Sequence, residues 1–149
     1  MKTTLLLRIA AVLAVLFALG HTMGGPWTPT EERSAASVVD AMKSVRFDVA
    51  GSSRSYWDFY YGFGVSISVY LFAQAILLWL LATLAKTQAA AARPFVVVLL
   101  ASYAANVFVT WRYFFVVPLV LSIAIVICLT LALVASRRHV DIEPSAHLT

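Results

Sequence analysis

An acidic side chain stands among aromatic residues in the segment "SYWDFYYGFG" at 55–64, directly before a long apolar run. Acids near a membrane usually have a partner or a function, because an unpaired charge there is costly. Asp58 has three candidate partners: Arg54 four residues earlier, Arg112 at the end of another apolar segment, or a ligand. The sequence leaves these alternatives open. A fourth alternative is that the Asp58 carboxylate has no partner and simply reaches water.

Polar residues recur at four-residue steps in two apolar segments, and these steps predict a polar seam. The two stripes are Asp58, Gly62, Ser66, Tyr70, Gln74 and Ser102, Asn106, Thr110, with Tyr103 beside the second. If they face each other, they predict interhelical hydrogen bonds or a cavity open to a ligand. The Gly62-x-x-x-Ser66 spacing also predicts close approach by a neighbouring helix.

We expect such a cavity to bind a lipid, a quinone or another small apolar molecule near the outer leaflet. Aromatic walls would supply contact area, and a few polar groups would orient the ligand. The expected ligand-binding residues are His21, Trp57, Asp58, Tyr61, Ser66, Tyr103, Asn106 and Arg112.

Sequence signatures of catalysis and of metal binding are absent. There is no paired intramembrane carboxylate, no nucleophile beside a base, no glycine-rich phosphate loop and no zinc spacing. Cys128 is the only cysteine, which excludes an intrachain disulfide and a multi-cysteine metal site. His21 with Met23 is a weak metal signal. We therefore predict no catalytic residue, no metal and no cofactor, and favour a binding protein over an enzyme.

The composition places these residues in a membrane protein. Of 149 residues, 62% are hydrophobic and only 12% are charged, whereas soluble domains carry about 25% charged residues. A chain this short cannot enclose so much apolar surface in one core. The formal charge of +4 comes from basic residues at the ends of apolar segments, which is typical of membrane topology and argues against nucleic-acid binding.

Four apolar segments are long enough to cross ~30 Å of hydrocarbon. We predict an all-α fold, a four-helix transmembrane bundle that forms a single membrane domain over residues 1–149. The predicted spans cover about 4–20, 58–85, 94–112 and 116–136.

The first apolar segment has two interpretations. It resembles a secretory signal that is cleaved after Gly20, but Arg8 interrupts its apolar part. In a retained helix, Arg8 can extend to the interface. We favour the retained helix.

The basic residues predict the orientation of the spans. Lys2, Arg8, Lys86, Arg93, Arg137 and Arg138 fall on one side. Because short cytoplasmic loops are enriched in Lys and Arg, we place this side inside. Both termini and the tail 137–149 are then cytoplasmic, in a multi-pass protein of the inner (plasma) membrane.

The first external loop is predicted to hold an amphipathic helix at about 29–48. Thr28, Pro29 and Glu31 form a candidate capping box at its start. Apolar residues then recur at three- and four-residue steps: Ala35, Val38, Val39, Met42, Val45 and Val49. Such a helix is too polar to span and would lie on the outer membrane surface or cover the bundle.

The stretches "HTMGGP", "AMKSVRFDVAGSSRSYWDFYYGFGVSIS" and "WRYFFVVP", in this order, resemble a group of small bacterial four-span membrane proteins. That resemblance covers most of the chain and implies no activity. Span number and size also resemble the DoxX-like proteins and the sterol-isomerase-type (emopamil-binding) bundles. The isomerase type uses acids and a histidine inside its bundle, and only Asp58 and His21 could stand in for them here.

Three functions remain open. The chain binds lipid or a small apolar ligand, or it is an accessory subunit that packs against a membrane-protein partner or a second copy, or it is a small lipid-modifying enzyme.

Overall fold

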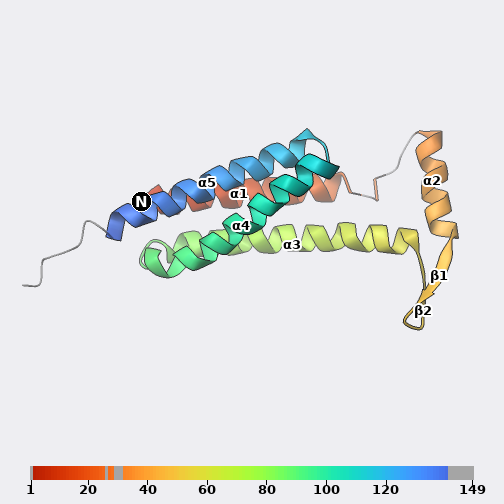
Figure 1. Cartoon of the computed structure of the whole chain (residues 1–149), viewed down its shortest axis with the longest axis horizontal. Helices are drawn as coiled ribbons and strands as arrows, with labels where there is room; N and C mark the ends of the chain where they lie inside the picture. Colours follow the sequence, from red (N-terminus) through yellow and green to blue (C-terminus); the bar gives the residue numbers. More distant parts are fainter. Residues whose placement is uncertain (1, 26, 29–31, 141–149) are drawn as a thin grey trace, which may run out of the picture. The chain divides into compact units, whose positions relative to one another are not determined.

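The computed structural model describes residues 2–25, 27–28 and 32–140, with side chains as far as Ser136. Pro29 and Glu31 of the predicted capping box, and most of the predicted tail, lie outside these residues. The elements are α1 (Lys2–Met23), α2 (Arg33–Ser44), β1 (Arg46–Val49), β2 (Ser52–Ser55), α3 (Tyr56–Leu84), α4 (Ala89–Tyr113) and α5 (Val116–Val140), as labelled in Figure 1.

Four of these helices are long and apolar enough to cross a membrane. They are Lys2–Met23, Tyr56–Leu84, Ala89–Tyr113 and Val116–Ser136. The four predicted spans are confirmed as helices, and the third begins earlier than expected, at Ala89. This arrangement is compatible with a multi-pass integral membrane protein.

The chain divides into two compact units, of which the first comprises Met1–Phe17 and Phe72–Thr149. Its core consists of apolar side chains at three- and four-residue steps on each helix, which gives every helix one buried face. The core side chains include Leu7, Ala10, Ala14, Leu78, Ala82, Val96, Leu99, Tyr103, Ile125, Leu129 and Ala132. Many are alanines, and such small residues let helices approach closely in a membrane.

The second unit, Ala18–Leu71, contains the end of α1, then α2, a β-hairpin and the first half of α3. The hairpin pairs Arg46 with Ser55 and Val49 with Ser52. Its turn is Ala50–Gly51, with φ of 48° and 78°. Two successive positive φ values are typical of the type I′ turn that matches the twist of paired strands.

The structure has a β-hairpin where the sequence predicts the end of a helix that reaches position 48. Helix α2 ends at Ser44, and Val45 is already extended, with φ −78° and ψ 111°. The last predicted helical residues, 46–48, lie in β1, so the predicted end of the helix was wrong. The physical reason is that Val45, Phe47 and Val49 also alternate with polar residues, as a strand requires, and the turn at Ala50 returns the chain. None of the residues of α2 is buried, so its predicted surface role stays a prediction.

Candidate functional site

Asp58 stands at the first turn of α3, where it forms a reciprocal capping box with Ser55. The Ser55 N–H donates to Oδ2 of Asp58 at 2.8 Å, and the Asp58 N–H donates to Oγ of Ser55 at 3.1 Å. Each side chain thus accepts a bond from a backbone N–H that has no partner inside the helix. The acid among the aromatic residues therefore has a structural task, which is to start α3.

Two arginines of the hairpin converge on one carbonyl oxygen beside this cap. Nη2 of Arg46 donates to the Ser53 carbonyl at 3.0 Å, and Nη1 of Arg54 donates to the same oxygen at 3.1 Å. Nε of Arg46 also donates to Oγ of Ser53 at 3.3 Å. The hydrogen bonds of Arg54 and Asp58 thus go to Ser53 and Ser55, so the local Arg54–Asp58 hydrogen-bonded pair is not formed.

An open groove of about 280 Å³ runs along this end of α3. It is lined by Arg54, Asp58, Phe59, Gly62, Phe63 and Ser66. Its α3 residues share one helix face, because residues three and four apart are neighbours on a helix. Two exposed phenylalanines border it, and at Gly62 an added Cβ would meet no atom within 4 Å.

Another face of α3 packs against the end of α1. Nε2 of His21 lies 3.0 Å from the Gly64 carbonyl oxygen, and Oγ1 of Thr22 donates to Oγ of Ser68 at 3.0 Å. Both Gly64 and Ser68 are buried. In this unit the small-residue contact is therefore Gly64-x-x-x-Ser68, two residues after the predicted one, and Gly62 makes no close contact.

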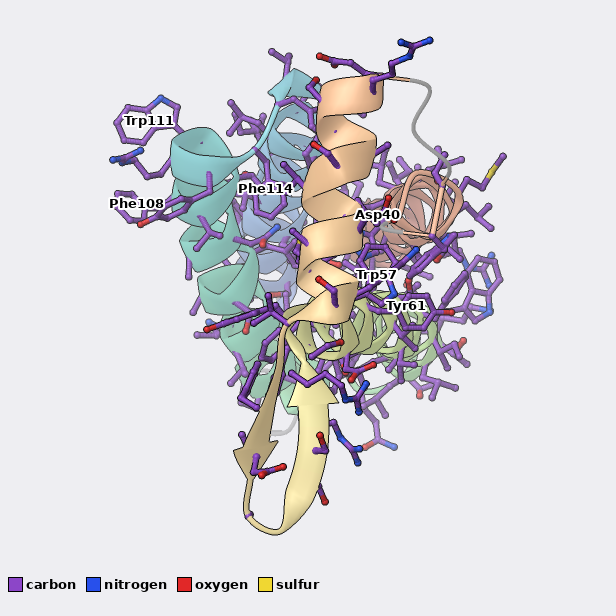
Figure 2. The ribbon with its side chains drawn as sticks, turned by 90° about the vertical axis from the view of Figure 1, so that its right-hand side faces the viewer. Asp40, Trp57, Tyr61, Phe108, Trp111 and Phe114 are labelled. Carbon is purple, nitrogen blue, oxygen red and sulfur yellow. The ribbon has the colours of Figure 1, made fainter. Side chains whose placement is uncertain are left out.

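Aromatic side chains gather beside the cap. The ring centroids of Trp57 and Tyr61 are 6.3 Å apart, and Figure 2 shows the two residues near each other. Trp27 meets Tyr61 edge-on at 5.6 Å, and Nζ of Lys43 lies 4.9 Å from the centre of the Trp57 ring. The Lys43 contact is a cation–π interaction that links α2 to the first turn of α3.

Trp27 is held against the end of α1. Its Nε1 donates to the Thr22 carbonyl at 2.6 Å. A Cβ at Gly25 would overlap the Trp27 ring, so the indole lies where only a glycine leaves room for it.

Three predicted site residues lie in the other unit. Nδ2 of Asn106 donates to Oγ of Ser122 at 2.9 Å, which joins α4 to α5. Tyr103 is 2% exposed, and its hydroxyl has no hydrogen-bond partner among the described residues. The Arg112 guanidinium lies 5.3 Å from the Tyr113 ring centre, in the aromatic end of α4 where Figure 2 labels Phe108 and Trp111.

The eight predicted residues thus fall into two groups. The groups are His21, Trp57, Asp58, Tyr61, Ser66 in the second unit and Tyr103, Asn106, Arg112 in the first. Within the second unit, the groove brings Asp58 and Ser66 together, and Trp57 and Tyr61 belong to the aromatic cluster. The pocket that would join both groups, and the Asp58–Arg112 pair, stay predictions.

Sequence reasoning missed Ser55, Arg46 and the two groove phenylalanines. The capping box was visible as Ser-x-x-Asp at 55–58, because a hydroxyl and an acid at this spacing mark a helix start. Arg46 and Ser53 carried no such signal, since only the hairpin brings them together.

No group of three or more His, Cys, Asp or Glu residues that could hold a metal ion exists in the described part of the chain. Cys128 is a half-buried free thiol on α5.

Comparison with family models, curated proteins and solved structures finds no match for this chain. The class of the protein, a multi-pass integral membrane protein, therefore rests on its four apolar helices.

Proposed function

We propose that this membrane protein binds a lipid or a similar amphiphile in the groove along α3. The observation that carries the proposal is the order of groups in the groove. Charged side chains stand at its β2 end, at Arg54 and Asp58, and Phe59 and Phe63 border the part that continues into the apolar helix. A molecule with a polar head and an apolar tail fits this order better than a purely apolar ligand.

The gap at Gly62 supports selective binding. Hydrophobicity alone cannot select a ligand in a membrane, because lipid tails are as apolar as the helix surface. The shape of a groove can select a ligand. A groove contacts a bound molecule on several sides, whereas a smooth helix surface contacts it on one side only. Gly62 and Ser66 are the smallest residues that line this groove, and an added Cβ at Gly62 would meet no atom within 4 Å.

We place this groove at the outer leaflet, with both termini cytoplasmic in the inner (plasma) membrane. In this orientation the apolar side chains of α2, such as Val38 and Met42, face the outer membrane surface. Two contacts support this arrangement. Lys43 of α2 lies over Trp57, and Phe47 of the hairpin lies 4.8 Å from Tyr56 between ring centroids. Both Trp57 and Tyr56 begin a span, where such rings mark the membrane interface.

The experiment is lipid retention by the full chain in mild detergent, measured by native mass spectrometry. An added Cβ at Gly62 meets no atom within 4 Å, so we expect Gly62→Leu to fold, to occupy the groove and to retain several-fold less lipid. Gly20→Leu is the matched control, because it adds the same side chain to a helical glycine of the same unit with open space around it. Equal retention by both variants and the wild type would refute groove binding.

A second candidate function is that of an accessory subunit, with a helix of a partner or of a second copy in the groove. The open Gly62-x-x-x-Ser66 face favours it, because small residues at this spacing permit close helix packing. Purification in mild detergent separates the two functions. A stoichiometric protein partner that Gly62→Leu releases would favour the subunit, and retained lipid without protein would favour the binding protein.

A further inference from the structure

We infer that Arg46 and Arg54 bind the phosphate of a phospholipid whose acyl chain occupies the α3 groove. This inference rests on the proposed function and names the headgroup that the groove selects. It depends on three features of the second unit: the convergence of the two guanidinium groups, the acceptors they already use, and the place of Arg54 at the groove.

The two guanidinium groups are held close together by a shared acceptor. Arg46 and Arg54 each donate to the carbonyl oxygen of Ser53, at 3.0 and 3.1 Å. Their bonded nitrogens therefore lie within two hydrogen-bond lengths of each other. Like charges at this separation repel, and the carbonyl that joins them is neutral. The Asp58 carboxylate attracts both guanidinium groups but accepts its bond from the Ser55 N–H. An anion that accepts the remaining N–H groups of both arginines would reduce their repulsion further.

Both arginines keep free donors for an anion. A guanidinium has five N–H groups in a planar fork, and the described hydrogen bonds of Arg46 and Arg54 all go to Ser53 rather than to a carboxylate. Asp58, the acid of the groove, accepts the Ser55 N–H at 2.8 Å. Paired arginines with free forks favour phosphate, whose oxygens can accept two parallel N–H bonds.

The hairpin aims Arg54 at the groove. Arg54 pairs with Phe47, and residues directly opposite each other in a ladder share one face. Phe47 stacks on Phe59, with ring centroids 5.8 Å apart, so this face of the hairpin is the one that meets α3. Arg46 starts from the other face and reaches the shared carbonyl. A headgroup at Arg54 is therefore within reach of Arg46.

The acyl chain would continue from this headgroup along α3. From Asp58 to Ser66 the helix rises ~12 Å at 1.5 Å per residue, and Phe59 and Phe63 stand along this length. The site therefore has two arginines and one aspartate at one end, which leaves a net positive charge, and a groove bordered by phenylalanines beyond it. This combination suits a phospholipid better than free phosphate.

The test compares phosphatidylglycerol with diacylglycerol of the same acyl chains, both added to the full chain for native mass spectrometry. The wild type should bind the phospholipid about tenfold more tightly, which corresponds to ~1.4 kcal/mol. Arg46→Gln with Arg54→Gln should abolish this preference, because it should weaken phosphatidylglycerol binding about tenfold more than diacylglycerol binding. The control is Arg33→Gln, which removes a charge from α2 of the same unit, leaves the Lys43–Trp57 contact in place and should keep the preference.

The remaining outcomes separate this inference from the proposed function. If Gly62→Leu weakens both lipids and the arginine variant keeps the preference, the headgroup inference is wrong and groove binding stands. If Gly62→Leu weakens neither lipid, both proposals fail. An equal loss in the α2 control would mean general charge attraction and would overturn the inference, as would inorganic phosphate that binds as tightly as the lipid. Should the double variant not fold, Arg54→Lys replaces it and should lower the preference while it keeps the charge.

Discussion

Ser55 and Asp58 each accept a hydrogen bond from the other's backbone N–H at the start of α3, at 3.1 and 2.8 Å. Free N–H groups at a helix end need partners, and near hydrocarbon water is a scarce one. The pair supplies these partners within four residues. It also fixes the point where the polar hairpin becomes an apolar helix, and so sets the place of the groove residues that follow.

Removal of this cap should destabilise the protein. We expect Ser55→Ala to cost about 1 kcal/mol of folding free energy, as lost N-caps do, and Asp58→Ala to lower the melting temperature as well. Each change removes only one of the two bonds, because the donors are backbone N–H groups that both variants keep. The double variant should therefore lose about the sum of the single losses. Thermal unfolding in detergent measures all three, and an unchanged melting temperature in either single variant would contradict the reciprocal cap.

The same cycle with Arg112→Gln tests the predicted Asp58–Arg112 pair. Asp58→Asn is the suitable partner variant, since it keeps an oxygen that can accept the Ser55 N–H and removes the charge. A coupling between the two changes would favour the pair, and strictly additive losses would rule it out.

The register of the small residues on α3 gives a second prediction. Gly64 is buried and its carbonyl oxygen lies 3.0 Å from His21 Nε2, so Gly64→Leu should separate the helices and cost 1–3 kcal/mol, about the usual penalty of overpacking. Gly62→Leu is the control, because a Cβ there meets nothing within 4 Å. The melting temperatures of the two variants in detergent show which glycine lies in the helix contact. A larger loss at Gly62 would restore the register predicted from the sequence.

How far the sequence could predict the site depends on the range of the contacts involved. The importance of Asp58 followed from its place among aromatic residues. A partner for its carboxylate was sought at Arg54 and Arg112, while the nearer backbone N–H of Ser55 donates to it. A periodicity of four also could not separate Gly62 from Gly64, because each belongs to a small-residue pair at this spacing. Only the packing of α1 against α3 decides which pair is buried.

A third prediction concerns the contact between α4 and α5. Nδ2 of Asn106 donates to Oγ of Ser122 at 2.9 Å, and Ser122 is fully buried. A double-mutant cycle with Asn106→Ala and Ser122→Ala should give a coupling energy of about 0.6 kcal/mol, the average for such bonds in membranes. Thr130→Ala on α5 is a control for Ser122→Ala, because Thr130 is exposed and bonds only to its own helix. Zero coupling would show that the pair contributes no stability.

The spans could be predicted because length and hydropathy nearly determine them, since only a helix satisfies its backbone alone in hydrocarbon. The hairpin could not, because Val45 and Val49 fit the helical period and the strand alternation equally well. What separates the two is the backbone at Ala50, which has φ of 48°. The stretch "GSSRS" from Gly51 onward predicts a turn. Alanine rarely adopts a positive φ, so Ala50 did not mark the two-residue hairpin turn that it forms with Gly51.

That strained alanine supplies the last prediction. Ala50→Asn should stabilise the hairpin by about 0.5–1 kcal/mol, because asparagine tolerates positive φ and Asn-Gly is the preferred pair for a type I′ turn. Hydrogen exchange of the β1 and β2 amides is the suitable measurement, since it reports local opening. Protection should rise about two- to fivefold, as this energy implies. Ala50→Val should lower protection, because a β-branched residue fits this conformation poorly. Unchanged protection in both variants would mean that the turn does not hold the strands together.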